Sequence, residues 1–126
     1  LSMGAEQYGA PATVAKGARA LSAYLEQKVG WKNFQVTEGA GLSRNNRATP
    51  RQLVRLLRHF EPNQGLLPVE RKHYRAKTGT LTGVSTLIGY FNRGNGTVAR
   101  FAVLTSGRVT PDYRYRVADS LRQCLL

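Results

Sequence analysis

Apolar residues recur every three or four positions in three segments of the chain, and this spacing predicts three helices. The first helix is expected over residues 13–29. Thr13 suits its start, because a threonine can cap the first turn, and Gly30 suits a left-handed stop. Its apolar face contains Ala18, Leu21, Leu25 and Val29.

The second helix is expected to begin at Thr49-Pro50-Arg51-Gln52. Threonine caps, proline takes the first helical position, and Gln52 completes a capping box. Its apolar face contains Leu53, Leu56, Leu57 and Phe60, and Pro62 ends it. The third helix follows the cap Thr110-Pro111-Asp112, and its expected apolar face contains Tyr113, Val117, Leu121 and Leu125.

Between the second and third helices the apolar pattern changes to that of strands. Residues 73–78, 84–91 and 97–104 are predicted strands, and residues 92–96, Asn-Arg-Gly-Asn-Gly, form a hairpin turn between the last two. Residues 34–36 favour a short strand, and residues 38–46 and 63–69 favour loops. This order predicts an α+β fold in which helices pack on an antiparallel sheet of three strands.

Composition limits the function classes without choosing among them. A chain of 126 residues forms one domain or part of one. Its formal charge of +12 attracts polyanions such as nucleic acid, an anionic membrane face or an acidic wall polymer. No apolar run is long enough to cross a membrane. The single cysteine, Cys124, is expected to be buried, and with His59 and His73 it offers too few ligands for a zinc site.

Residues 76–83 have the sequence Ala-Lys-Thr-Gly-Thr-Leu-Thr-Gly, which contains the most informative motif of the chain. Lys-Thr-Gly is one of three elements of penicillin-recognising serine enzymes, and the others are Ser-x-x-Lys and a Ser-x-Asn. Lysine and threonine can hold a carboxylate, and glycine lets a ligand backbone approach the strand. None of the six serines has a lysine three residues later, so this chain contains no Ser-x-x-Lys nucleophile.

A second segment makes the match specific. Residues 38–50 have the sequence Glu-Gly-Ala-Gly-Leu-Ser-Arg-Asn-Asn-Arg-Ala-Thr-Pro. They resemble the Asp-Gly-Ser-Gly-Leu-Ser-Arg segment of the D-alanyl-D-alanine carboxypeptidase/endopeptidase family, the class C low-molecular-weight penicillin-binding proteins. Residues 76–84 resemble the Lys-Thr-Gly strand of that family. The resemblance covers nearly all of residues 1–126, as the C-terminal portion of a transpeptidase-like D,D-peptidase domain with no internal boundary.

The resemblance implies a penicillin-binding serine peptidase of the periplasm or cell envelope, without a cofactor. Such an enzyme removes the terminal D-alanine of peptidoglycan stem peptides, or cuts their cross-links, through an acyl-enzyme. The implied partners are the stem peptide, β-lactam antibiotics and the upstream part of the same protein. The implied fold is a central antiparallel sheet flanked by helices, with strands at one edge missing here. We therefore expect an exposed apolar surface, which a homodimer or another fragment covers.

The resemblance also implies roles for individual residues. Lys77 would hold the terminal carboxylate, with help from the hydroxyls of Thr78 and Thr80. The N–H of Thr80 would be one oxyanion donor. Gly79 would let the substrate lie antiparallel along the strand edge. Lys77 and Thr80 are thus the catalytic candidates of this chain, and Thr78 and Gly79 are substrate-binding candidates.

Ser43-Arg44-Asn45 fits the Ser-x-Asn pattern, which makes Ser43 and Asn45 further substrate-binding candidates. In the family, however, the catalytic Ser-x-Asn precedes the helix that residues 13–29 resemble, whereas the Gly-Leu-Ser-Arg segment follows it. On that order both other catalytic elements lie upstream of this chain. Glu38 and Ala40 replace the more usual aspartate and serine.

The alternative function is a non-catalytic basic module that binds an acidic polymer, either peptidoglycan or nucleic acid. Its basis is the charge of +12 and a stripe of Arg51, Arg55 and Arg58 on one helix face. The sequence contains no recognised nucleic-acid motif, so nucleic acid is not an expected partner under the first interpretation. A degenerate relative that binds peptidoglycan without cutting it stands between the two.

Overall fold

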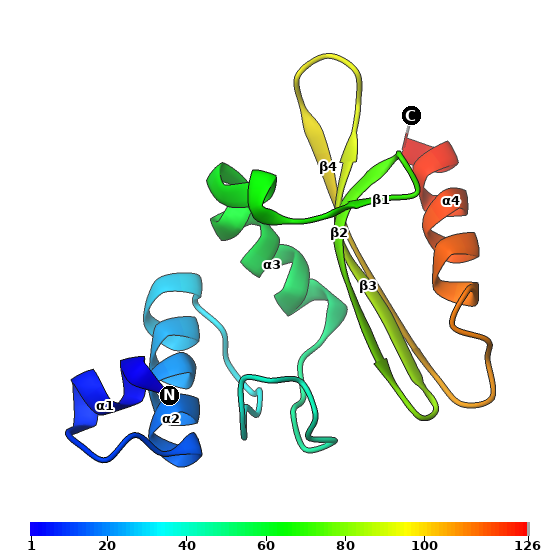
Figure 1. The fold of residues 1–126 in the computed structure, drawn as a ribbon. Coiled ribbons are helices and arrows are strands. Elements are labelled where there is room, and N and C mark those ends of the chain that lie inside the picture. Colours follow the sequence, from blue (N-terminus) through cyan, green and yellow to red (C-terminus); the bar gives the residue numbers. More distant parts are fainter. Residues whose placement is uncertain (126) are drawn as a thin grey trace. The chain divides into compact units, whose positions relative to one another are not determined.

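The computed structural model describes residues 1–125, and its helices and strands fall into two units, Leu1–Gln52 and Leu53–Leu126. Figure 1 shows the elements in chain order. No helix of the described residues is long and apolar enough to span a membrane. The prediction that residues 1–126 belong to one domain portion without an internal boundary stays a prediction.

The first unit contains α1 (Ser2–Tyr8), α2 (Val14–Tyr24) and a π-helical continuation, η1 (Leu25–Val29). The predicted first helix is confirmed with both of its ends. The Lys16 N–H donates to the Thr13 hydroxyl at 3.2 Å, and Gly30 is left-handed at φ 75°. Helix α1 was not predicted. A Cβ at Gly4 would lie 2.5 Å from the Gly17 nitrogen, so glycine lets α1 approach α2 closely.

The predicted strand over residues 34–36 is wrong, because the segment forms only an isolated bridge between Gln35 and Arg47. The segment is held by side chains instead. Trp31 is buried, meets Phe34 edge-on and donates from its ring N–H to the Gln52 carbonyl at 2.9 Å. A packed indole with a satisfied N–H gives this region a fixed geometry without a sheet.

Helix α3 (Pro50–Phe60) begins with the predicted capping box. The Gln52 N–H donates to the Thr49 hydroxyl at 3.2 Å, and the Thr49 N–H donates to the Gln52 side chain at 2.7 Å. The helix ends as expected before Pro62. The chain then continues as a 3₁₀ helix, η2 (Glu61–Leu66), where a loop was expected.

The second unit contains an antiparallel sheet in the order β1-β2-β3-β4. The three predicted strands are confirmed as β2 (Tyr74–Leu81), β3 (Val84–Asn92) and β4 (Val98–Ser106). The fourth strand, β1 (Val69–Glu70), was not predicted. It begins at the last residue of an expected loop and is only two residues long, which is too short to give a periodic pattern. Strand β2 extends to Leu81, so Lys-Thr-Gly lies inside the strand.

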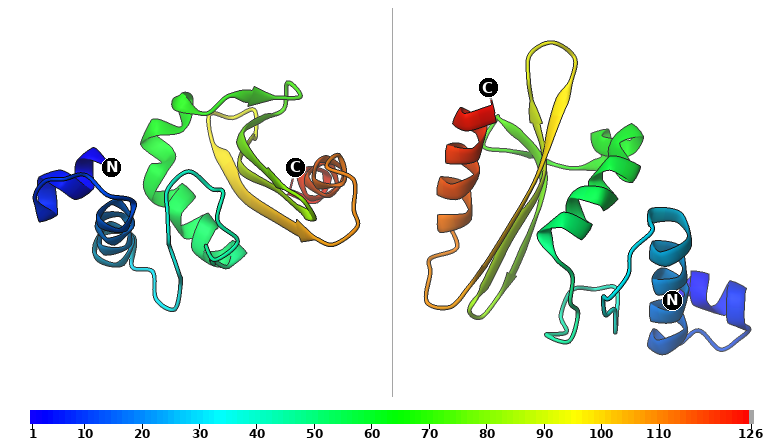
Figure 2. Two further views of the ribbon diagram at one scale, coloured as in Figure 1. Left: turned by 60° about the horizontal axis from the view of Figure 1, so that its bottom comes forward. Right: turned by 180° about the vertical axis from the view of Figure 1, so that it is seen from behind.

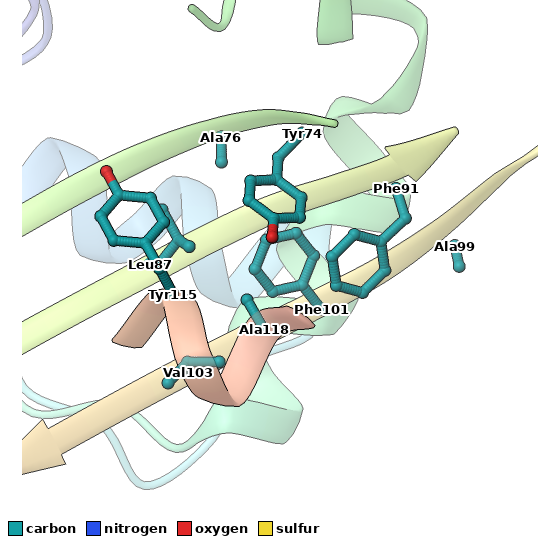
Figure 3. Packing of buried hydrophobic residues seen from close by; sticks show 9 residues of the cluster. All are labelled: Tyr74, Ala76, Leu87, Phe91, Ala99, Phe101, Val103, Tyr115 and Ala118. Carbon is teal, nitrogen blue, oxygen red and sulfur yellow. The ribbon is translucent and has the colours of Figure 1, made fainter. Parts of the chain in front are cut away.

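Helix α4 (Tyr113–Leu125) covers one face of this sheet and encloses the main core (Figures 1 and 2). Figure 3 shows the core, in which the rings of Phe91 and Phe101 stack with centroids 4.1 Å apart. The cluster consists of Tyr74, Ala76, Leu87, Phe91, Ala99, Phe101, Val103, Tyr115 and Ala118. The fold class predicted from the sequence, helices on an antiparallel sheet, is confirmed.

The predicted apolar face of α4 is wrong for three of its four residues, since only Val117 packs against the core. Its members Tyr113, Leu121 and Leu125 are 40%, 37% and 44% exposed, whereas Arg114, Tyr115 and Ala118 are buried. The small side chain of Ala118 lets the helix approach the sheet, and Tyr115 stacks on Tyr74 with centroids 6.5 Å apart. The outward side of the same helix also carries Cys124, which is exposed, contrary to expectation.

The opposite face of the sheet receives the α3 segment from Leu53 onward (Figure 2). The Tyr90 hydroxyl donates to the Leu57 carbonyl at 2.6 Å, and both residues are buried. Burial raises the pKa of Tyr90 to about 12, so this phenol stays protonated and keeps its hydrogen bond at physiological pH. The sheet is therefore covered on both faces, and its accessible backbone lies at the edges.

Candidate active site

The outer edge of β2 is open along the Lys-Thr-Gly segment. Strand β1 pairs with β2 only at Val69↔Arg75 and Glu70↔Tyr74. From Lys77 to Leu81, β2 has no strand partner on that side among the described residues. An open edge presents backbone N–H and C=O groups to which another extended chain can bind.

Sheet geometry indicates which backbone groups face the open edge. Strands β2 and β3 are joined by the two-residue turn 82–83, with Gly83 at φ 71°. In an antiparallel pair, alternate residues point their N–H and C=O to the same side. The Ala76 N–H donates outward, to the Pro68 carbonyl at 3.0 Å. Thr78 and Thr80 share that alternation, so their N–H and C=O groups face the open edge.

The Lys77 ammonium also lies at this edge. Its Nζ donates to the Thr78 carbonyl oxygen at 2.8 Å. Because that carbonyl points outward, the positive charge lies beside the backbone groups that a ligand would meet. A ligand carboxylate there could accept a charge-assisted hydrogen bond from Nζ.

Gly79 lies close to a side chain of its neighbour on β3. A Cβ at this position would lie 2.5 Å from the Thr86 Oγ1. The Thr86 hydroxyl donates to the Gly79 carbonyl at 3.4 Å, so it occupies the space that a side chain would need. A side chain at this position would therefore displace the Thr86 hydroxyl from the Gly79 carbonyl.

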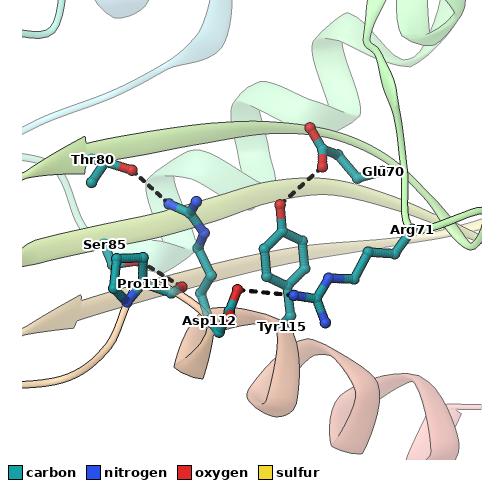
Figure 4. Close-up of polar contacts among 8 residues, drawn as sticks. Glu70, Arg71, Thr80, Ser85, Pro111, Asp112 and Tyr115 are labelled. Carbon is teal, nitrogen blue, oxygen red and sulfur yellow. Dashed lines mark hydrogen bonds and ion pairs between the residues drawn. The ribbon is translucent and has the colours of Figure 1, made fainter.

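The Thr80 side chain accepts a hydrogen bond from Arg114 of α4, a residue that was not predicted to belong to the site. Arg114 donates from Nη1 to the Thr80 Oγ1 at 2.8 Å, a bond drawn at Thr80 in Figure 4. Arg114 is buried although arginine is rarely so. The one signal in the sequence was its place in the first turn of a helix that follows the expected sheet.

The second predicted segment forms a loop in the first unit, organised by Glu38. Its carboxylate accepts hydrogen bonds from the N–H of Ala40 at 2.6 Å, the N–H of Ser43 at 3.0 Å and the Asn46 side chain at 2.9 Å. The Asn46 side-chain oxygen in turn accepts from the Thr37 N–H at 2.8 Å. Glu38 thus has a structural role in this loop.

Ser43 and Asn45 lie together in this loop. The Asn45 N–H donates to the Ser43 Oγ at 3.1 Å, which is a local turn contact rather than a pairing of a nucleophile with a base. These two candidates belong to the first unit, whereas Lys77, Thr78, Gly79 and Thr80 belong to the second. Their roles in binding stay predictions.

The Glu38 contacts make the loop dependent on pH. The hydrogen bond from the Ser43 N–H, foremost among several, lowers the pKa of Glu38 below its usual 4.5. A carboxyl group with a lowered pKa stabilises the folded loop above that usual value, and the stabilisation is lost as the pH falls through the lowered pKa. We therefore expect the amides of Ala40 and Ser43 to be protected from hydrogen exchange at pH 7 and to lose that protection when the pH is lowered well below 4.5.

NMR-detected exchange, expressed as protection factors, measures this effect. Glu38→Gln should lower protection at pH 7 and remove the pH dependence, because a neutral amide accepts more weakly. Glu6→Gln, on the exposed side of α1, is the matched control and should leave both amides unchanged. Equal protection at both pH values in the unmodified chain would contradict the role assigned to Glu38.

Within residues 1–125, no three His, Cys, Asp or Glu side chains lie close enough together to hold a metal ion. The described site consists instead of an open strand edge, a lysine, hydroxyls and backbone donors. These groups can bind a peptide and stabilise negative charge. They include no activated nucleophile.

Comparison with protein families gives a match over almost the whole chain. Residues 1–69 and 68–124 match the profile of the D-Ala-D-Ala carboxypeptidase 3 (S13) family. The chain belongs to this family. The first match contains the Glu38 loop and the second contains Lys77, so both motif segments lie within the S13 alignment.

A curated relative is the D-alanyl-D-alanine carboxypeptidase DacB of Haemophilus influenzae, which is 27% identical over 83% of this chain and 27% of its own length. Two crystal structures of penicillin binding protein 4 (dacB) from Haemophilus influenzae share the fold, and one is complexed with a novel β-lactam. The complex has a TM-score of 0.79 at 21% identity, covering 95% of this chain and 36% of that one. The other has a TM-score of 0.77 at 21% identity, covering 95% and 34%. This S13 chain thus spans about a third or less of the length of these relatives.

Proposed function

We propose that this chain is the C-terminal part of a serine-type D-Ala-D-Ala carboxypeptidase/endopeptidase and forms the substrate-binding strand of its active site. The observation that carries the proposal is the open edge of β2 at Lys77, Thr78, Gly79 and Thr80 in a chain of the S13 family. The substrate class is the peptidoglycan stem peptide, which places the protein in the periplasm or cell envelope. β-Lactam antibiotics bind at the same site.

The strand edge would position the substrate. An extended stem peptide pairs antiparallel with β2 through the outward backbone groups of Thr78 and Thr80. This pairing holds the scissile carbonyl in register with the Thr80 N–H, which donates to the oxygen as it becomes negative. The backbone donor does not need to reorganise during the reaction, because the sheet fixes it.

The side chains would hold the terminal carboxylate of the substrate. The Lys77 ammonium already lies at the edge, hydrogen-bonded to the Thr78 carbonyl, and can transfer this bond to a carboxylate. The Thr78 and Thr80 hydroxyls complete the contact. The site thereby favours peptides that end in a free carboxylate, and the same groups suit the carboxylate of penicillin.

The nucleophile would come from another segment of the protein. A Ser-x-x-Lys serine attacks the carbonyl and forms the acyl-enzyme, and its own N–H supplies the second oxyanion donor. Water then hydrolyses the ester. If β2 binds the substrate and another segment supplies the nucleophile, this chain can contain the binding strand without a serine–lysine pair.

Intact-mass measurement with benzylpenicillin tests the proposal. We expect the present chain alone to form no covalent adduct, because it has no Ser-x-x-Lys, and the complete protein that carries it to gain the mass of one penicillin. Ser43→Ala in the complete protein is the control and should still be acylated. A stable adduct on Ser43 of the chain alone would show that Ser43-Arg44-Asn45 has a catalytic role that we do not assign to it.

The same measurement separates the proposal from the alternatives. A complete protein that binds peptidoglycan but is never acylated would be a non-catalytic relative. A basic module for nucleic acid predicts binding to DNA that weakens steeply with salt, and the strand edge offers no reason for it.

A further inference from the structure

Arg114 is a buried cation directly behind the Lys-Thr-Gly strand. It is 8% exposed, in the first turn of α4. A buried guanidinium is costly unless hydrogen bonds or an opposite charge compensate it. The partners that the structure gives its Nη1 are neutral oxygens: Thr80 Oγ1 at 2.8 Å, the Gly79 carbonyl at 3.1 Å and the Thr86 carbonyl at 3.4 Å. Its Nε has no hydrogen-bond partner among the described residues.

The contact with Arg114 determines whether the Thr80 hydroxyl donates or accepts a hydrogen bond toward a ligand. A guanidinium has only donors, so the Thr80 oxygen must accept the bond from Arg114. The hydroxyl proton of Thr80 is then available to a different acceptor. Arg114 thereby makes the Thr80 hydroxyl a donor, which is the form that binds a carboxylate.

The contact with Gly79 acts on the backbone. The Gly79 carbonyl and the Thr80 N–H belong to one peptide group. That carbonyl accepts bonds from Arg114 and from the Thr86 hydroxyl. Hydrogen bonds to a carbonyl polarise its peptide, and a cationic donor does so most strongly, so the N–H at the other end becomes a better donor. This N–H faces the open edge of β2.

We propose that Arg114 is a positioning residue that acts through Thr80, making both its hydroxyl and its N–H stronger donors at the open edge. The hydroxyl serves the terminal carboxylate of a peptide or β-lactam, and the N–H serves the oxyanion. This inference rests on the function proposed above. Arg114 itself stays behind the strand and does not touch the substrate.

The two effects can be measured separately in the complete protein that carries this chain, with benzylpenicillin as the probe. Stopped-flow acylation gives the dissociation constant of the initial complex and the acylation rate constant at saturation. Arg114→Met removes the charge and keeps the length. We expect about a tenfold lower acylation rate constant, because the oxyanion donor is weakened but not removed, and about a threefold weaker initial complex.

Three further variants make the test specific. Thr80→Val removes the hydroxyl and keeps its shape, so in that background Arg114→Met should still slow acylation but no longer weaken the initial complex. Arg114→Lys keeps the charge, so both of its constants should lie between those of Arg114→Met and those of the unmodified protein. Arg71→Gln is the matched control, because Arg71 holds the same helix through Asp112 at 2.9 Å without contacting Gly79 or Thr80. Both constants should stay unchanged in it.

The outcomes distinguish this inference from the proposed function. If Lys77→Ala slows acylation but Arg114→Met and Arg114→Lys leave both constants unchanged, Arg114 only holds the fold and the inference is wrong. The inference is also wrong if Arg114→Met weakens the initial complex and slows acylation by the same factors in the Thr80→Val background as in the unmodified protein. If the complete protein is not acylated at all, the proposed function fails and this inference fails with it.

Discussion

Replacing Lys77 with alanine is expected to lower the acylation rate of the complete protein by benzylpenicillin about 100-fold, measured as the second-order rate constant. Lys77 Nζ lies at the open edge of β2, 2.8 Å from the outward Thr78 carbonyl. A hydrogen bond to a charged group contributes about 1.5–3 kcal/mol, and each 1.4 kcal/mol changes a rate about tenfold. Loss of the ammonium therefore removes the principal attraction for the carboxylate.

Lys77→Arg and Lys72→Gln provide the comparison. Arginine keeps the charge but not the compact ammonium, so we expect a loss of about tenfold. Lys72 lies in the turn between β1 and β2, away from the open edge, and its replacement should leave the rate unchanged. An acylation rate for Lys77→Ala within threefold of the unmodified protein would refute the role of this strand as the carboxylate site.

Most of the fold could be predicted from the sequence where local signals agree with packing. The capping box of Thr49 and Gln52 and the left-handed Gly30 are encoded within a few residues, and both appear in the structure. The three long strands have enough residues to show a pattern. Strand β1 and helix α1 were missed because two residues, or seven, are too few for their periodicity to stand out.

The face of α4 could not be predicted, because two faces of that helix carry apolar residues. The sequence pattern favours the face with Tyr113 and Leu121, but the face that packs against the sheet is the one with Tyr115 and Ala118. That choice depends on the shape of the opposing surface, where the Tyr74 ring lies against Tyr115. Local periodicity contains no information about this partner, which is 41 residues earlier in the chain.

The candidate site also combines features that the local sequence predicts with features that depend on tertiary packing. The motif at Lys77, Thr78, Gly79 and Thr80 is contiguous and could be recognised in the sequence. Its open edge depends on how far β1 extends, and Arg114 reaches Thr80 only because α4 crosses that face of the sheet. The role of Glu38 was also missed, since three of its partners meet only when the loop folds around it. The structure thus adds the contacts between distant segments and the folded conformation of this loop.

Replacing Gly89 with alanine is expected to have the largest effect on stability. Gly89 of β3 pairs with Ala76 of β2, and Ala76 is the residue just before Lys77. A Cβ at Gly89 would lie 2.2 Å from the Arg75 carbonyl oxygen and 2.6 Å from the Ala76 Cα, closer than any real contact. Both of these obstacles are backbone atoms, so β2 must move away from β3. Overpacking typically costs about 1–3 kcal/mol, and a clash with backbone atoms is expected at the upper end, which lowers the melting temperature by about 10 °C.

Thermal unfolding of the chain followed by circular dichroism measures this effect, and Gly65→Ala is the matched control. Gly65 lies in η2 with no atom within 4 Å of its added Cβ, so its replacement should change stability by less than about 0.5 kcal/mol. In the complete protein, Gly89→Ala should also slow acylation at temperatures where it remains folded, because displacement of β2 moves Lys77 and Thr80 together. A melting temperature within about 2 °C of the unmodified chain would mean that β2 and β3 are not packed as closely as described, and the geometry of the open edge would have to be revised.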